Sequence, residues 1–64
     1  MNILAKNKLS VLQAELRARL HLLQEAINDI QSGDEYDPAI YKETNLEIAF
    51  LEKTLNRIWE LKHD

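Results

Sequence analysis

The chain has no cysteine, and glycine and proline occur only once each in its 64 residues. Without cysteine it can form neither a disulfide nor a thiolate metal site, two devices that often stabilise very small domains. A chain of this length buries only about 60% of the surface that its unfolded form exposes. The remaining routes to a stable fold are regular helix packing and association with a partner.

The single glycine and the single proline both fall in one short segment, QSGDEYDP. Elsewhere most residues are good or tolerable helix formers. Gly33 is suited to the left-handed conformation that ends many helices. Asp37 is suited to cap the following helix, because its carboxylate can accept from free amides of the first turn, and Pro38 is favoured at the first helical position. Tyr36 and Tyr41 are spaced for a hydrophobic staple across this start.

These signals predict one all-α domain over residues 1–64. We expect a first helix at about 3–31, a turn at about 32–37 and a second helix at about 38–63. The two helices have similar lengths, and a connection of about six residues is typical between antiparallel neighbours. The predicted fold is therefore an antiparallel two-helix hairpin.

Each predicted helix carries a main apolar stripe with spacings of three and four residues, which marks one buried face. In the first helix the stripe consists of Leu9, Leu12, Leu16, Leu20, Leu23, Ile27 and Ile30. In the second it consists of Tyr41, Thr44, Ile48, Leu51, Leu55 and Ile58, with Trp59 beside it. We expect the two stripes to face each other.

Further apolar residues lie off these stripes, displaced by roughly 120–130° around each helix. A lone hairpin can bury only one stripe per helix, and each large apolar side chain left in water forgoes roughly 1.5–3 kcal/mol. We therefore expect self-association into a dimeric four-helix bundle, with a monomeric hairpin that binds another protein as the alternative. The candidate interface residues are Leu4, Val11, Leu22, Leu46, Phe50, Arg57, Trp59 and Leu61.

Charge is distributed unevenly along the predicted hairpin. The open end holds the bases Lys6, Lys8, Arg57 and Lys62, whereas the turn region holds the acids Asp29, Asp34, Glu35 and Asp37. An antiparallel pair of hairpins would place each acidic turn near the basic end of its partner, so we expect that orientation. Solvated charges each contribute well under 1 kcal/mol, and the alternative is that apolar packing alone sets the orientation.

The sequence does not favour catalysis or a bound cofactor. Asp34, Glu35 and Asp37 do not supply the longer ligand series of an EF-hand, and His21 and His63 match no metal-binding spacing. No nucleophile–base set and no glycine-rich phosphate loop occurs. We therefore expect a protein that is not an enzyme and holds no metal or cofactor.

The function that remains is protein binding by a small regulator, adaptor or inhibitor that works through helical faces. A hairpin dimer that binds nucleic acid through Lys6, Lys8, Arg17 and Arg19 is one alternative, disfavoured by the net charge of −3. A structural subunit of a larger assembly is another. No apolar run has the length of a membrane span or resembles a signal peptide, so we expect a cytoplasmic protein.

Overall fold

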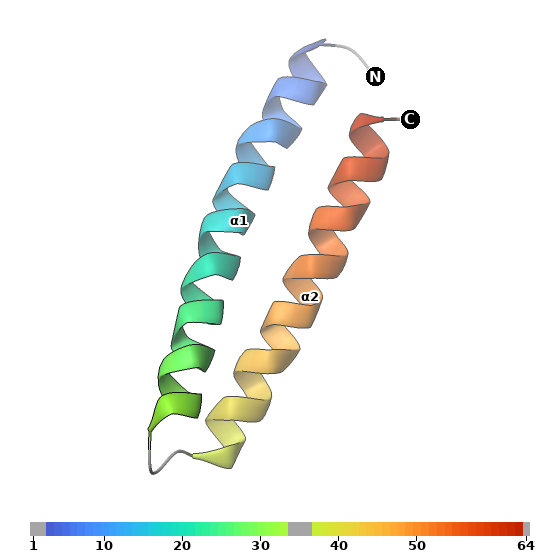
Figure 1. Ribbon diagram of the computed structural model, residues 1–64. Helices are drawn as coiled ribbons and strands as arrows, with labels where there is room; N and C mark the ends of the chain where they lie inside the picture. The colour runs from blue at the N-terminus through green and yellow to red at the C-terminus, as the bar shows by residue number, and fades with distance from the viewer. Residues whose placement is uncertain (1–2, 34–36, 64) are drawn as a thin grey trace.

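The computed structural model describes residues 3–33 and 37–63. Within them the chain forms two α-helices, α1 (Ile3–Ser32) and α2 (Pro38–Lys62), which run antiparallel and pack side by side (Figure 1). The expected all-helical hairpin is therefore confirmed. The Cα atoms span 50 × 14 × 12 Å, so the molecule is a rod in which no residue lies far from solvent.

Helix α2 begins at the aspartate and proline that the sequence singled out. Asp37 has φ −83° and ψ 114°, and its Oδ1 accepts a hydrogen bond from the amide of Ala39 at 2.8 Å. Its carbonyl oxygen accepts from the amide of Tyr41 at 3.0 Å, which is the first intrahelical bond. The predicted N-cap is confirmed, with Pro38 in the first turn. Tyr36, the other half of the expected staple, lies outside the described residues.

The end of α1 differs from the expectation. None of the described residues has a positive φ, so the prediction of a left-handed Gly33 is wrong. Instead the amide of Gly33 donates to the carbonyl oxygen of Ile30 at 3.2 Å, which closes the last turn more tightly than an α-helical bond would. The hydroxyl of Ser32 donates to the carbonyl oxygen of Asn28 at 2.8 Å. The helix can therefore end without the conformational freedom of glycine.

The core is a single seam between the two helices. Leu23 and Ile27 of α1 and Leu51 and Ile58 of α2 are its buried apolar residues. The other seam residues are partly buried; they are Leu9, Leu16, Leu20, Ile30, Tyr41, Thr44, Ile48 and Leu55. The polar members are satisfied locally, since the hydroxyl of Thr44 donates to the carbonyl of Ile40 at 2.8 Å. At the closed end, Nε2 of Gln31 donates to the hydroxyl of Tyr41 at 3.0 Å and links the helices.

One seam position of α1 is polar. Gln13 is 7% exposed and Leu12 is 43% exposed, so the placement of Leu12 in the main stripe is wrong. The physical reason is periodicity: a regular alternation of four and three residues from Leu9 to Leu16 passes through Gln13. Its Oε1 accepts a hydrogen bond from Nζ of Lys62, the last residue of α2, at 3.1 Å. The open end of the seam is therefore closed by a polar contact.

Replacing Leu51 by Ala should test the seam. Leu51 is 5% exposed, and truncating a buried leucine costs about 2–5 kcal/mol, a large part of the stability of so small a domain. We expect the urea unfolding midpoint, followed by circular dichroism at fixed protein concentration, to fall steeply. Glu52→Ala is the control, because this exposed side chain should change stability by about 0.5 kcal/mol or less. Equal losses from both variants would contradict the described seam.

Replacing Gln13 by Leu should have the opposite effect. An apolar side chain then continues the seam, and the partly buried Lys62 can turn its ammonium group to water along its aliphatic stem. We expect the free energy of unfolding to rise by about 1 kcal/mol. The exposed Gln24→Leu substitution on the same helix should leave it nearly unchanged. Lower stability of the Gln13 variant would mean that its bond to Lys62 outweighs apolar burial.

Candidate protein-binding face

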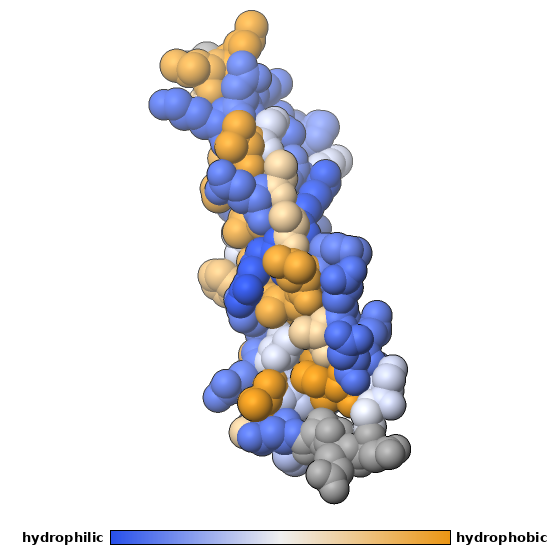
Figure 2. Space-filling view, turned by 90° about the vertical axis from the view of Figure 1, so that its left-hand side faces the viewer, coloured by the Kyte–Doolittle hydropathy of each residue, from blue (hydrophilic) through white to orange (hydrophobic). Residues whose placement is uncertain are grey.

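Most of the predicted interface residues are exposed in the structure. Phe50 of α2 has an exposed fraction of 66%, Leu22 of α1 has 57%, and Leu4, Val11 and Leu46 are similarly exposed. Figure 2, which views the molecule from the α1 side, shows apolar groups at the surface along its length, interrupted by polar ones. The hairpin therefore leaves large apolar side chains uncovered, as predicted for the residues that lie off the main stripes.

An ion pair between the helices shows which flanks of α1 and α2 meet. Nε of Arg19 lies 3.2 Å from Oε1 of Glu47, and both side chains are about half exposed. Residues spaced by seven lie on one row of a helix that packs in a seam of this kind. The row of Leu12 and Arg19 on α1 therefore borders the row of Glu47 and Leu61 on α2.

The ion pair separates the seam from an exposed apolar pair. Four residues beyond Arg19 and Glu47 lie Leu23 and Leu51, which are buried in the seam. Three residues beyond Arg19 lies Leu22, and three residues beyond Glu47 lies Phe50; both are exposed. Because residues three and four apart flank each other on a helix, Leu22 and Phe50 lie on the solvent side of the ion pair, one on each helix.

These side chains form one surface across both helices, which we call the ion-pair face. Its apolar groups surround a charge pair that is already neutralised, an arrangement that suits a protein partner better than a charged ligand. Leu12 adds to its exposed area, whereas Leu61 is partly buried against the hairpin. The members of the ion-pair face are Leu12, Arg19, Leu22, Glu47, Phe50 and Leu61.

Trp59 is not part of this face. It lies twelve residues from Glu47, which places it about 120° around α2 and on the far flank of the seam. Its indole ring stacks on the imidazole of His63, with ring centroids 4.2 Å apart and an interplanar angle of 36°. Trp59 is more than half exposed, so this contact covers only part of the ring. The structure does not bring Trp59 together with Leu46 and Phe50.

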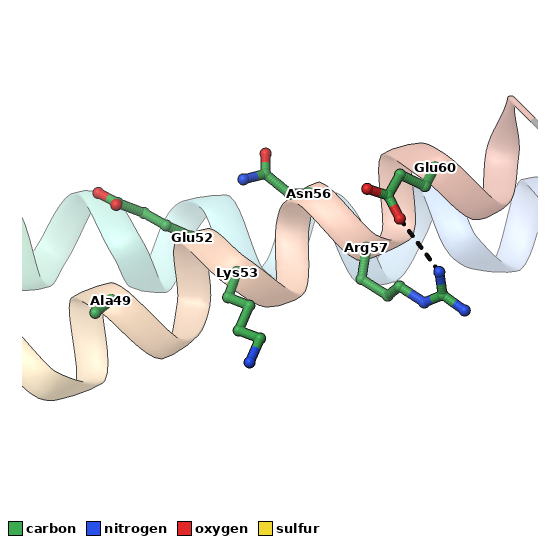
Figure 3. Close-up of a pocket in the computed structure, with 6 residues that line it drawn as sticks. All are labelled: Ala49, Glu52, Lys53, Asn56, Arg57 and Glu60. Carbon is green, nitrogen blue, oxygen red and sulfur yellow. Dashed lines mark hydrogen bonds and ion pairs between the residues drawn. The ribbon is translucent and has the colours of Figure 1, made fainter.

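Arg57 lies at the edge of a shallow hollow on the outer surface of α2 (Figure 3). Its Nη1 lies 3.2 Å from Oε2 of Glu60, in an exposed ion pair one turn along the helix. All the residues that line the hollow come from this one helix, so it cannot enclose a small molecule as a cleft between elements does. They are Ala49, Glu52, Lys53, Asn56, Arg57 and Glu60.

Residues 3–33 and 37–63 contain no group of three or more His, Cys, Asp or Glu side chains that could hold a metal ion. His21 lies near one carboxylate, with its Nε2 2.9 Å from Oε1 of Glu25, and both side chains are exposed. The turn acids Asp34 and Glu35 lie outside the described residues. Within the described part of the chain, neither helix is long and apolar enough to cross a membrane.

The chain matches no protein-family model, no curated protein and no solved structure. The geometry of the described residues is therefore the basis for the function proposed below.

Sequence reasoning did not single out Glu47, and it considered Arg19 only as a nucleic-acid ligand. The signal was present, because opposite charges that flank a helical seam commonly pair across it. If Gln13 is taken as the seam position of α1 in place of Leu12, Arg19 and Glu47 fall on facing flanks of the two helices. The same alignment would have moved Leu12 out of the core and onto the exposed face.

A double-mutant cycle should test the flank assignment. Arg19→Ala, Glu47→Ala and the double variant should give a coupling free energy of about 0.2–1 kcal/mol, the usual value for an exposed ion pair. The coupling should shrink in 1 M salt, where the screening length falls to about 3 Å. The measurement is urea unfolding at low and high salt. A coupling of zero at low salt would show that these two rows do not meet.

Proposed function

We propose that this chain is a small, non-enzymatic protein-binding regulator, adaptor or inhibitor that acts through its helical faces as a homo-oligomer. The observation that supports it best is the exposure of Leu22 and Phe50 on either side of the Arg19–Glu47 ion pair. Burying a large apolar side chain stabilises a complex by roughly 1.5–3 kcal/mol. Aromatic residues, Phe among them, are also enriched in protein interfaces relative to the rest of the surface.

A second copy is the simplest partner for this surface. A twofold arrangement presents the same patch on both chains, so every apolar residue covered on one copy is covered on the other. Two hairpins that pack in this way form a dimeric four-helix bundle, in which the apolar side chains of both hairpins share one core. A target protein would then bind the remaining outer surface, which includes the half-exposed Trp59.

The distribution of charge favours an antiparallel dimer. The first turn of α1 and the last turn of α2 lie at one end of the rod, with the bases Lys8, Arg57 and Lys62, and α1 ends and α2 begins at the other (Figure 1). Asp29 and Asp37 lie toward the turn end. Antiparallel packing sets these opposite charges near each other, whereas parallel packing brings like charges together.

Light scattering on wild type and Phe50→Glu should test the proposal. We expect a wild-type dimer, and a variant whose dissociation constant is at least about a hundredfold higher, because both copies lose an apolar contact and gain a buried charge. The matched control is Ala49→Glu, which adds the same charge at the neighbouring exposed position on a different side of α2. It should remain dimeric.

Three results would count against this reading. A wild type that stays monomeric at high concentration would overturn self-association and leave the ion-pair face for a different protein. A Phe50→Glu variant that remains dimeric would remove that face from the interface. Equal dissociation of the Ala49 and Phe50 variants would indicate a general charge effect.

A further inference from the structure

We propose that a second copy of this chain docks antiparallel along the exposed flank of α2 that carries Phe50, about a twofold axis beside Phe50. This inference rests on the self-association proposed above and specifies its surface and its orientation. The surface consists of exposed residues that lie within about 60° of Phe50 around the helix, and we call it the Phe50 strip. Its main members are Glu43, Leu46, Glu47, Phe50, Lys53 and Arg57.

The charges of the strip are complementary to themselves. Glu43 and Arg57 lie seven residues before and after Phe50, and Glu47 and Lys53 lie three residues before and after it. A twofold axis at Phe50 relates two antiparallel copies of α2. It places each residue level with the residue of the partner that lies equally far on the other side of Phe50. Glu43 and Arg57 lie within about 20° of Phe50 around the helix, so Glu43 then faces the partner's Arg57, which makes two favourable pairings in the dimer. Glu47 and Lys53 lie about 60° to either side of Phe50, on opposite flanks of the contact.

The apolar residues obey the same symmetry. Phe50 meets the partner's Phe50 on the axis, where two aromatic rings can stack with an offset. Leu46 and Lys53 lie on the same flank of Phe50, so Leu46 lies beside the aliphatic stem of the partner's Lys53. Further out, Ala39 lies opposite the partner's Leu61.

The alternatives lack this complementarity. A parallel pairing of two α2 helices sets each residue against its own copy, so Glu43 meets a glutamate and Arg57 meets an arginine. The same antiparallel operation about Leu22 of α1 sets Glu15 opposite the partner's Asp29, two like charges. Charge complementarity therefore centres the twofold axis on Phe50 of α2 rather than on Leu22 of α1.

Contacts within one copy leave the strip accessible. Glu47 binds Arg19 and Arg57 binds Glu60, but the four side chains in these ion pairs remain 44–69% exposed. Exposed ion pairs of this kind are weak and exchange readily. Lys53 and Arg57 project from the same side of α2, away from Glu52 and Asn56 (Figure 3). The basic half of the strip therefore presents both its charges in one direction.

Charge reversal should test the orientation. Glu43→Arg sets two arginines opposite each other at both ends of an antiparallel dimer, so its dissociation constant in low salt should rise by roughly tenfold. Arg57→Glu should weaken the dimer similarly, and the Glu43→Arg, Arg57→Glu double variant should restore it to within about twofold. Glu52→Arg makes the same change of charge about 160° from Phe50, and it should leave the dissociation constant unchanged. Sedimentation gives these constants, and circular dichroism checks that each variant stays helical.

A distance measurement should test the axis directly. The chain has no cysteine, so a single Lys42→Cys substitution at the flank of the strip allows one nitroxide label per copy. In the proposed dimer the two labelled positions are sixteen residues apart along the helix, or roughly 24 Å. In a parallel dimer they lie side by side, at roughly 10 Å, the spacing of packed helices.

The outcomes separate this inference from the proposed function. A wild-type dimer with a long label distance and rescue by the double variant supports both. A wild-type dimer with a short label distance, or with equal responses to Glu43→Arg and Glu52→Arg, overturns the Phe50 strip and leaves self-association intact. A monomeric wild type overturns both.

Discussion

The structure depends on one contact, the apolar seam between α1 and α2. No cysteine reinforces it, and no third element covers either helix within the described residues. Even the most buried seam side chains, Leu51 and Ile58, remain 4–5% exposed. Each residue in a seam of this kind buries little apolar surface. Fixing its backbone alone costs about 1–2 kcal/mol in conformational entropy. The apolar surface left outside the seam is thus the largest unused source of stability.

The polar groups near the seam determine how the helices align. Asp37 fixes where α2 begins, and the contact between Gln31 and Tyr41 fixes its first turn against the last turn of α1. At the other end, the hydrogen bond from Lys62 to Gln13 can form in only one register of the two helices. A polar residue at a seam position commonly specifies alignment at a cost in stability. Apolar packing holds the helices together, and these contacts select one of the possible alignments.

The sequence was sufficient to predict the helices and the start of α2, because periodicity and capping are local properties. It was less informative where two helices must be considered together. Leu12 is apolar and lies next to a seam position, so only the seven-residue repeat shared with α2 identifies Gln13 as the buried residue. Glycine also suggested a left-handed helix end at Gly33, yet a bond from its amide to Ile30 serves instead. The exposure of Phe50 was predictable because one seam can bury only one stripe.

The position of the two chain ends has a mechanical consequence. The N-terminal turn of α1 and the last turn of α2 lie at the same end of the rod (Figure 1). A force applied between them acts across the seam and separates one layer of side chains at a time, as in unzipping. It does not shear all the layers at once, as it would if the ends lay at opposite poles. The bond between Gln13 and Lys62 is in the region that opens first, whereas Ile30 and Tyr41, beside the turn, separate last.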